Sequence, residues 1–251
     1  MKKPILKNSW EIELLRKANA IVAEVLLSIK EEVKPGKVTL ELEELALKIC
    51  EKRKVKPAFK GYKGYPYALC VSINEEVVHG MPSESKVLKE GDIVSFDFGV
   101  CYEGYYGDAA ITVPVGKISS DAERLLKVTE EALYIGIDKA RVGNRIGDIS
   151  YAIQSYVEGE GFNVIKSFVG HGIGRNLHEP PEVPNFGKKG TGAKIDAGLV
   201  IAIEPMVSMG DWRVKILEDG WTAVTVDGSL SAHFEHSIVV TPKGPEILSR
   251  I

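Results

Sequence analysis

Residues 94–99 read VSFDFG and residues 106–113 read YGDAAITV, and these two runs decide the fold. Each is an apolar stretch with strand character that a single aspartate interrupts, Asp97 in the first run and Asp108 in the second. A turn centred on residues 102–103 would join the runs into a β-hairpin and set the two aspartates face to face. Directly opposed like charges destabilise a strand pair, and neither strand contains Lys or Arg. The sequence therefore predicts a cation between the two carboxylates, and a bound metal ion is the simplest choice.

Three more acid or imidazole side chains occur downstream in similar surroundings. Glu204 lies within the apolar run VIAIEPM, Glu235 precedes a β-branched strand in AHFEHSIVV, and His171 is flanked by glycines in FVGHGIGRNL. With the two aspartates they supply four carboxylates and one imidazole, so their charge matches two divalent cations. Oxygen ligands with one nitrogen suit Mn, Fe(II), Co or Zn better than a metal that prefers thiolates. Two such metals side by side acidify a water molecule and polarise a substrate, which indicates hydrolytic chemistry.

The composition is that of an ordinary globular chain. Of the 251 residues, 44% are hydrophobic and 27% are charged, and a net charge of −3 gives no reason to expect a nucleic-acid partner. The three cysteines, Cys50, Cys70 and Cys101, are widely spaced without a CxxC, which predicts neither a disulfide framework nor a zinc knuckle. The N-terminus lacks the apolar core of a signal peptide, and no run reaches membrane-spanning length. We therefore expect a cytoplasmic protein without a membrane partner.

The order of the motifs indicates an internal repeat. Gly36 opens GKVTLELEELA, and Gly143 opens GNRIGDISYAI 107 residues later. Gly91 opens GDIVSFD, and Gly198 opens GLVIAIE at the same offset of 107, with an acid six residues after the glycine in both. Two agreeing offsets and a matched acid favour duplication over coincidence.

The two halves of the repeat would form one domain. Helical periodicity is clear over residues 11–32 and over residues 121–139, and each stretch would open one half. We expect a single catalytic domain over residues 1–251, with halves at about 10–115 and 120–245. Two pseudo-symmetric halves would place equivalent strands, and so equivalent acids, about a common axis.

Several segments, taken in order, resemble the bacterial type I methionine aminopeptidases of the creatinase and aminopeptidase superfamily. They are GYKGYPYALCVSIN (61–74), VVHGMP (77–82), FDFGV with YGDAA, GHGIGRNLHEPP (170–181), IEPM (203–206) and DGWTAVTVDGSLSAHFEHS (219–237). The resemblance covers nearly the whole chain, from the first helix to about residue 240. It implies the pita-bread fold, an α+β architecture in which two pseudo-symmetric α/β halves surround a mixed, largely antiparallel sheet.

The resemblance also implies a dinuclear metal site. Asp97 would hold one metal, and His171 with Glu204 would hold the other. Asp108 and Glu235 would bridge both. The metals could be Co, Mn, Fe(II), Zn or Ni, and a hydroxide that they activate would attack the first peptide bond of the substrate.

Three residues would have catalytic roles by the same resemblance. Glu204 would take the proton from the water and pass it to the leaving amine. His178 would contact the scissile carbonyl oxygen and stabilise the oxyanion, and His79 would contact the substrate's backbone nitrogen. A histidine in the position of His79, taken alone, is more often a hydrogen-bonded core residue than a functional one. The match of the surrounding VVHGMP segment to the family favours the functional role. His233 and His236, which flank the last ligand, are interpreted as structural neighbours because the family's ligand set is complete without them.

A methionine pocket would lie beside the metals. The positions that resemble the family's pocket hold Tyr62, Tyr65, Cys70 and Trp221. Aromatic faces and sulfur make favourable contacts with a thioether, although ordinary core packing is the alternative explanation for such residues. Phe59 stands where the enterobacterial pattern has a cysteine, and Leu177 stands where it has a phenylalanine. Because both positions stay apolar, we expect the pocket to bind methionine still, with a changed width. A monovalent cation site near Asn74 and Ser231 is also implied.

The implied activity is removal of the N-terminal methionine from nascent proteins and peptides whose second residue is small. The partner would be a peptide or nascent-chain N-terminus, which a monomeric enzyme could meet at the ribosome. An Xaa-Pro dipeptidase or aminopeptidase is the alternative enzyme, but these usually carry a further N-terminal domain, and only about ninety residues precede Asp97. A relative that binds RNA or protein without catalysis is the alternative from another class, but such proteins have lost metal ligands that this chain retains.

Overall fold

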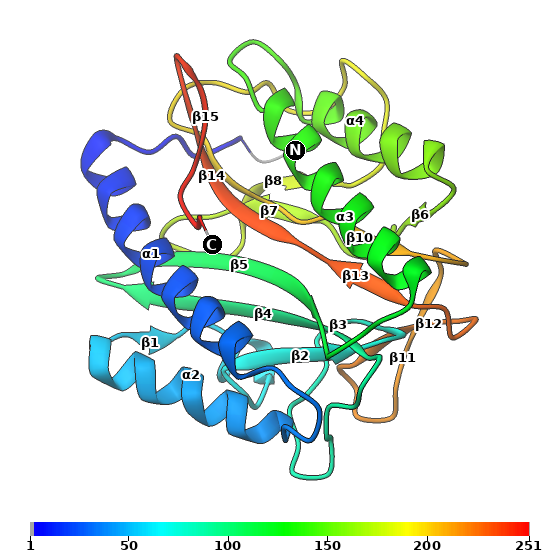
Figure 1. Ribbon diagram of the computed structural model, residues 1–251. Coiled ribbons are helices and arrows are strands. Elements are labelled where there is room, and N and C mark those ends of the chain that lie inside the picture. The colour runs from blue at the N-terminus through cyan, green and yellow to red at the C-terminus, as the bar shows by residue number, and fades with distance from the viewer. Residues whose placement is uncertain (1–2, 251) are drawn as a thin grey trace.

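The helices of the protein lie on the outside of a curved β-sheet. The computed structural model describes residues 3–250. Its helices are α1 (Ser9–Glu32), α2 (Thr39–Arg53), α3 (Ser120–Lys139) and α4 (Ile146–Gly159), with a short 3₁₀ helix, η1, at Tyr62–Gly64. The pair α1 and α2 covers one half of the sheet, and the pair α3 and α4 covers the other (Figure 1). None of the helices in residues 3–250 combines the length and the apolar character needed to cross a bilayer.

Antiparallel pairing joins every strand pair in the described part of the chain. The strands before α3 are β1 (Lys56–Pro57), β2 (Leu69–Ile73), β3 (Glu76–Val78), β4 (Ile93–Tyr102) and β5 (Tyr105–Pro114). Those after α4 are β6 (Asn163–Val164), β7 (Gly170–Gly172), β8 (Glu179–Val183), β9 (Val200–Ile203), β10 (Met206–Ser208), β11 (Val214–Ile216), β12 (Ala223–Thr225), β13 (Ser231–His233), β14 (Glu235–Thr241) and β15 (Gly244–Ile247). The main sheet has the order β1-β4-β5-β14-β9-β7-β8, with β2 also on β4 and β15 on β14. Two smaller sheets, β13-β10-β6 and β11-β12-β3, accompany it.

Both helical patterns in the sequence are confirmed, and local capping explains where the helices begin. The side chain of Asn8 accepts a hydrogen bond from the Glu11 backbone N–H, and the Glu11 carboxylate accepts one from the Asn8 N–H, each at 3.0 Å. This reciprocal capping box satisfies two backbone donors at the start of α1. Ser119 starts α3 in a similar way, because its hydroxyl accepts the Ala122 N–H at 3.2 Å.

The strands β4 and β5 have opposite chemistry on their two faces. Phe96 and Phe98 are fully buried in the apolar cluster beneath α1, whereas Asp97 between them must face the other way. The helix lies so close to β5 that a Cβ on Gly107 would come within 2.8 Å of the α1 backbone. The helices thus close the convex face of the sheet with apolar contacts, and the acids are left on the concave face.

The hairpin of β4 and β5 has a register that differs by two residues from the sequence-based prediction. Its turn lies at residues 103–104, both with positive φ, as in the two-residue turns that suit twisted hairpins. Asp97 therefore pairs with Ala110, and Asp108 pairs with Gly99. The expectation that the two aspartates oppose each other directly was wrong. A shift of two residues keeps each side chain on its original face, so the aspartates are diagonal neighbours on the concave side.

Equivalent elements begin at the offset that the sequence suggested. The helices α2 and α4 start at Thr39 and Ile146, and the strands β4 and β9 start at Ile93 and Val200, in both cases 107 residues apart. The single domain over residues 1–251 and its division into duplicated halves at 10–115 and 120–245 stay predictions.

Candidate metal centre and substrate pocket

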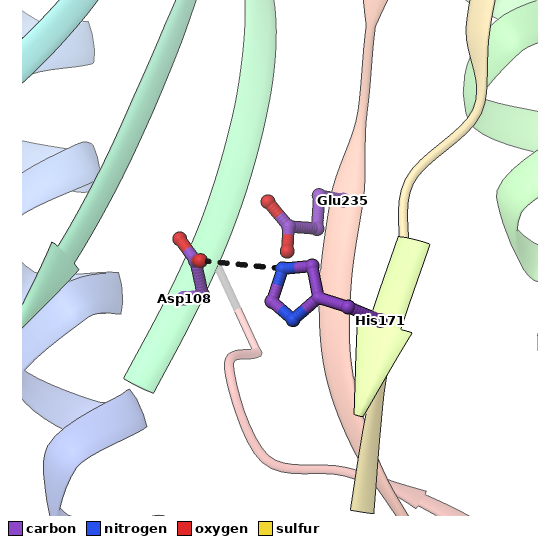
Figure 2. A group of neighbouring side chains, drawn as sticks. All are labelled: Asp108, His171 and Glu235. Carbon is purple, nitrogen blue, oxygen red and sulfur yellow. Dashed lines mark ion pairs between the residues drawn. The ribbon is translucent and has the colours of Figure 1, made fainter. Parts of the chain in front are cut away.

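Three of the expected ligands meet on the concave face of the main sheet. Asp108 on β5, His171 on β7 and Glu235 at the start of β14 each offer one ligand atom within 4.8 Å of the other two. Figure 2 shows their side chains pointing toward one another from separate strands. The strand order explains this convergence, since β14 pairs with both β5 and β9, and β9 pairs with β7. All three side chains are buried, so their charges interact with little screening by solvent.

Asp97 and Glu204 line the same cavity as these three residues. Asp97 comes from β4, the strand beside β5. Glu204 directly follows β9, and its Oε1 lies 3.6 Å from Nε2 of His171. The backbone carbonyl of Glu204 accepts a hydrogen bond from the buried side-chain amide of Asn185 at 2.9 Å, which fixes the turn that carries the acid. The structure therefore brings all five expected ligands around one space.

The carboxylates of this site lack the partners that buried charges require. Within the described residues, Oδ1 of Asp97, Oδ1 of Asp108 and Oε1 of Glu235 are buried and accept no hydrogen bond. Burial raises the pKa of Asp97 to about 7, although a hydrogen bond with Asp108 opposes the rise. Burial, and then the charges of Glu235 and Asp97, raise the pKa of Asp108 well above its usual range. Uncompensated anionic oxygens in this arrangement fit divalent cations.

The imidazole of His171 is prepared to act as a neutral ligand. Its Nδ1 lies 3.0 Å from the Gly172 carbonyl oxygen, to which it can donate, and this orients the ring. Burial lowers the pKa of His171 to about 4, so the ring is neutral near pH 7. A neutral ring that donates from Nδ1 keeps the lone pair on Nε2, which faces the carboxylates at 3.6 to 3.8 Å.

Two further histidines line the cavity next to these ligands. Nδ1 of His178 lies 2.9 Å from the hydroxyl of Tyr62, and the two rings stack with their centres 5.3 Å apart. Although His178 is an exposed residue, partial desolvation of its ring in the cavity, and then the nearby imidazole of His171, lower its pKa to about 3. Burial also lowers the pKa of His79, whose ring lies edge-on to Trp221. Both rings are therefore neutral hydrogen-bonding groups near pH 7.

A cavity of about 370 Å³ leads to the ligands. All six residues expected to form the methionine pocket line it, namely Phe59, Tyr62, Tyr65, Cys70, Leu177 and Trp221. The hydroxyl of Tyr65 donates to the carbonyls of Leu69 and Gly80, at 3.2 and 3.0 Å, and its ring meets that of Trp221 edge to face at 5.2 Å. Burial raises the pKa of the Cys70 thiol, which keeps it protonated and weakly polar. The cavity wall is thus apolar and held in place.

Sequence reasoning missed part of this wall. The additional lining residues are Lys63, Val78, Ser167, Phe168 and Val169. Val78 directly precedes His79, and Phe168 and Val169 directly precede the GHG motif, so adjacency to a motif was the available signal. Lys63 directly follows Tyr62 in the motif of residues 61–74, and its Nζ lies 5.4 Å from the ring centre of Tyr62.

The histidines on either side of Glu235 differ in their surroundings. Nε2 of His233 is buried without a hydrogen bond in the described residues and lies 3.7 Å from Oε2 of Glu204, so His233 borders the metal centre. His236 belongs to the opposite face, where its Nδ1 lies 3.0 Å from the hydroxyl of Ser249.

The curved antiparallel sheet carries buried carboxylates that need a cation, and these lie beside an apolar pocket. This combination defines a metal-dependent hydrolase. The profile of one family, described as metallopeptidase family M24, matches residues 13–242. The chain belongs to this family.

Related proteins match over nearly the full length of the chain. The methionine aminopeptidase of Clostridium perfringens is 56% identical over 98% of this chain and 99% of its own. The crystal structure of methionine aminopeptidase from Thermotoga maritima, 54% identical, has a TM-score of 0.97 and covers 99% of this chain and 100% of its own. The prolidase of Pyrococcus horikoshii has a TM-score of 0.80 over 98% of this chain and 64% of its own, and at 22% identity it shows a likeness of fold alone.

Proposed function

We propose that this metallopeptidase removes the N-terminal methionine from nascent proteins and peptides when the second residue is small. One observation carries the proposal: a substrate-sized apolar cavity, with sulfur and aromatic groups in its wall, ends at the five converging ligands. A linear side chain that fills the cavity would place the first peptide bond of the substrate beside these ligands. The high identity to proteins named methionine aminopeptidase supports the same substrate.

The five converging side chains would hold two divalent cations. Asp97 would bind one, His171 with Glu204 the other, and Asp108 with Glu235 would bridge. The four carboxylates supply the charge that two divalent ions balance, and His171 supplies a neutral nitrogen. When bound, such ions act as Lewis acids that acidify water and polarise the scissile carbonyl. Their identity among Co, Mn, Fe(II), Zn and Ni depends on supply as well as on affinity.

The surrounding residues would orient the substrate and move its protons. With the Tyr62 hydroxyl donating to Nδ1, the neutral ring of His178 carries its proton on Nε2 and can donate it to the carbonyl oxygen. His79, also neutral, would contact the backbone nitrogen of the substrate. Glu204 would accept a proton and deliver it to the leaving amine. The apolar walls around Cys70 and Trp221 would exclude water from the methionine side chain.

Three further parts of the proposal concern the surroundings of the enzyme. Asn74 and Ser231 lie outside the cavity, where the Ser231 N–H donates to the Asn74 carbonyl at 2.8 Å, and a monovalent cation would bind next to this contact. The protein would act as a monomer in the cytoplasm. Nascent chains emerging from the ribosome would be its substrates.

The test uses metal-stripped protein titrated with each of the five divalent ions. It is assayed on Met-Ala-Ser, Met-Lys-Ser and Ala-Pro-Gly. We expect methionine release from the first peptide alone. Cleavage of the third peptide would show proline specificity instead, and no cleavage with any ion would favour a binding protein. Asp108→Asn should abolish activity, whereas Glu182→Gln, which changes an exposed acid on β8, should retain it.

A further inference from the structure

A buried ion pair lies outside the catalytic cavity and joins the segment before α1 to the start of β8. Nζ of Lys7 lies 2.5 Å from Oε2 of Glu179, and the two side chains are only 2% and 3% exposed. The residues are 172 positions apart in the chain. Lys7 immediately precedes the cap of α1, and Glu179 is the first residue of β8, directly after His178. A fully buried charge pair is costly to form, so its presence at this place calls for a function.

Each member of the pair is itself fixed by the backbone around it. Lys7 donates from Nζ to the Ile5 carbonyl at 3.2 Å and from its backbone N–H to the Gly198 carbonyl at 2.7 Å. Glu179 uses its second oxygen, Oε1, to accept the Asn176 N–H at 3.1 Å. The pair thus connects the segment before α1 to the loop between β7 and β8.

The loop of residues 174–178 packs closely against this ion pair. A Cβ on Gly174 would lie 2.3 Å from Cε and 2.6 Å from Nζ of Lys7, so the loop backbone rests directly on the lysine. On its other side, the Gly174 carbonyl accepts the Tyr106 N–H at 2.9 Å. The same loop ends in Leu177 and His178, which face the catalytic cavity.

We propose that Lys7 and Glu179 are positioning residues that act on catalysis through His178. The inference rests on the proposed function, because it concerns the role of His178 toward the scissile carbonyl. The Lys7 ammonium fixes the position of the Glu179 carboxylate, which in turn accepts a hydrogen bond from the Asn176 N–H. The loop from Asn176 to Glu179 then determines the orientation of the His178 ring. A displacement of about 1 Å at a catalytic group can lower the rate by about 100-fold, so a contact that never touches the substrate can still control kcat.

The test is a double-mutant cycle between Lys7→Met and His178→Ala, assayed on Met-Ala-Ser with Mn²⁺. In the otherwise unchanged protein, Lys7→Met should lower kcat by about 10-fold or more while KM changes by less than about threefold. In the His178→Ala background the same substitution should change kcat by less than about twofold, since the group it positions is absent. Equal losses in both backgrounds would overturn the proposal.

A second measurement does not depend on activity. Hydrogen exchange at the Asn176 amide should accelerate in Lys7→Met, because the acceptor on Glu179 is no longer held. Bound metal per chain should stay unchanged. Unchanged exchange, or loss of metal, would contradict a role through the loop. If Lys7→Met does not fold, Lys7→Met/Glu179→Gln replaces it in both measurements, since it removes both charges together. Exchange at Asn176 should still accelerate, because a neutral amide oxygen accepts a weaker hydrogen bond than the carboxylate that it replaces.

Lys37→Met is the matched control. Lys37 is also a partly buried lysine in ion pairs, with Glu32 and Glu41, but it belongs to the connection between α1 and α2. It should leave kcat and Asn176 exchange unchanged. If the unsubstituted protein does not cleave Met-Ala-Ser, the proposed function fails, whereas an active protein with an additive cycle removes only the positioning role.

Discussion

Glu235→Gln should change the stability of the protein in opposite directions without and with metal. In the metal-free protein, Glu235 is a buried carboxylate whose Oε1 has no hydrogen-bond partner in the described residues, and it lies against other acids. Burial, and then the charges of Glu204 and Asp97, raise its pKa well above the usual range. Replacing it by a neutral side chain of the same shape removes a repulsion. With metal bound, the same change removes a ligand.

The size of the effect follows from the spacing of the ligand atoms. Those of Asp108 and Glu235 lie within 4.8 Å. At that distance and an effective dielectric constant of 20, two like charges repel by about 3 kcal/mol. Partial protonation of the cluster reduces this, so we expect a gain of about 1–2 kcal/mol, which corresponds to about 3–6 °C in the unfolding midpoint of a domain this large.

The pH dependence of this gain has a definite sign. The pKa of Asp97 is raised from its ordinary value of 3.8 to about 7 in the folded protein. The folded state therefore holds more protons than the unfolded state between these values, and the stability of the metal-free protein falls as the pH rises through this window. The benefit of Glu235→Gln should be largest at pH 8 and should fade toward pH 4.

Thermal unfolding at pH 8 provides the assay, with EDTA in one series and Mn²⁺ in the other. The variant should unfold at a higher temperature than the wild type in EDTA. In Mn²⁺ the order should reverse, because a ligand at 100 times its Kd stabilises the wild type by about 2.7 kcal/mol and the variant binds more weakly. Glu182→Gln should show neither effect. A variant that is less stable than the wild type by the same amount in both series would refute the repulsion argument.

Three other substitutions, and one control, test the fold and the pocket. Gly107→Ala should cost about 1–3 kcal/mol in urea unfolding, because its Cβ would meet the α1 backbone at 2.8 Å, whereas Gly159→Ala, with nothing within 4 Å, should gain about 0.5 kcal/mol. Glu43→Leu should cost about 3 kcal/mol or more in the same assay, since it leaves two buried N–H donors, now bound at 2.8 and 2.9 Å, without acceptors. Leu177→Ala should lower kcat/KM on Met-Ala-Ser by about 10-fold or more, because the pocket loses apolar contact.

The sequence was most informative where a local pattern and a local structure coincide. The two long helices follow from apolar periodicity, although the first begins at Ser9, two residues before the periodic stretch, where the side chain of Asn8 caps it. The acid Asp97 was recognisable because it lies between two core phenylalanines, which strand alternation sends to the opposite face. The gathering of the other ligands came from the family resemblance, because spacing in a sequence does not define distance across a sheet.

The remaining features depend on contacts that no short segment contains. The hairpin register was missed because a glutamate, Glu103, takes a left-handed conformation at φ 49°, which residues other than glycine and asparagine rarely adopt. The Lys7–Glu179 pair was missed for a different reason. A lysine just before a helix normally lies in solvent, and only the complete fold brings its partner from 172 residues away.

The candidate metal centre and the hydrophobic core share the same strands, so core packing opposes the mutual repulsion of the acids. The alternation in β4 that buries Phe96 and Phe98 under α1 also holds Asp97 on the concave face. Releasing Asp97 from its neighbours would require moving those phenylalanines out of a close-packed core, and each such residue contributes about 2–3 kcal/mol by burial. Together the two phenylalanines contribute about 4–6 kcal/mol, which exceeds the repulsion of about 3 kcal/mol estimated for one pair of carboxylates. We therefore expect core packing to hold the proposed ligands close together when metal is removed, so that relief of their repulsion contributes to the affinity for divalent ions.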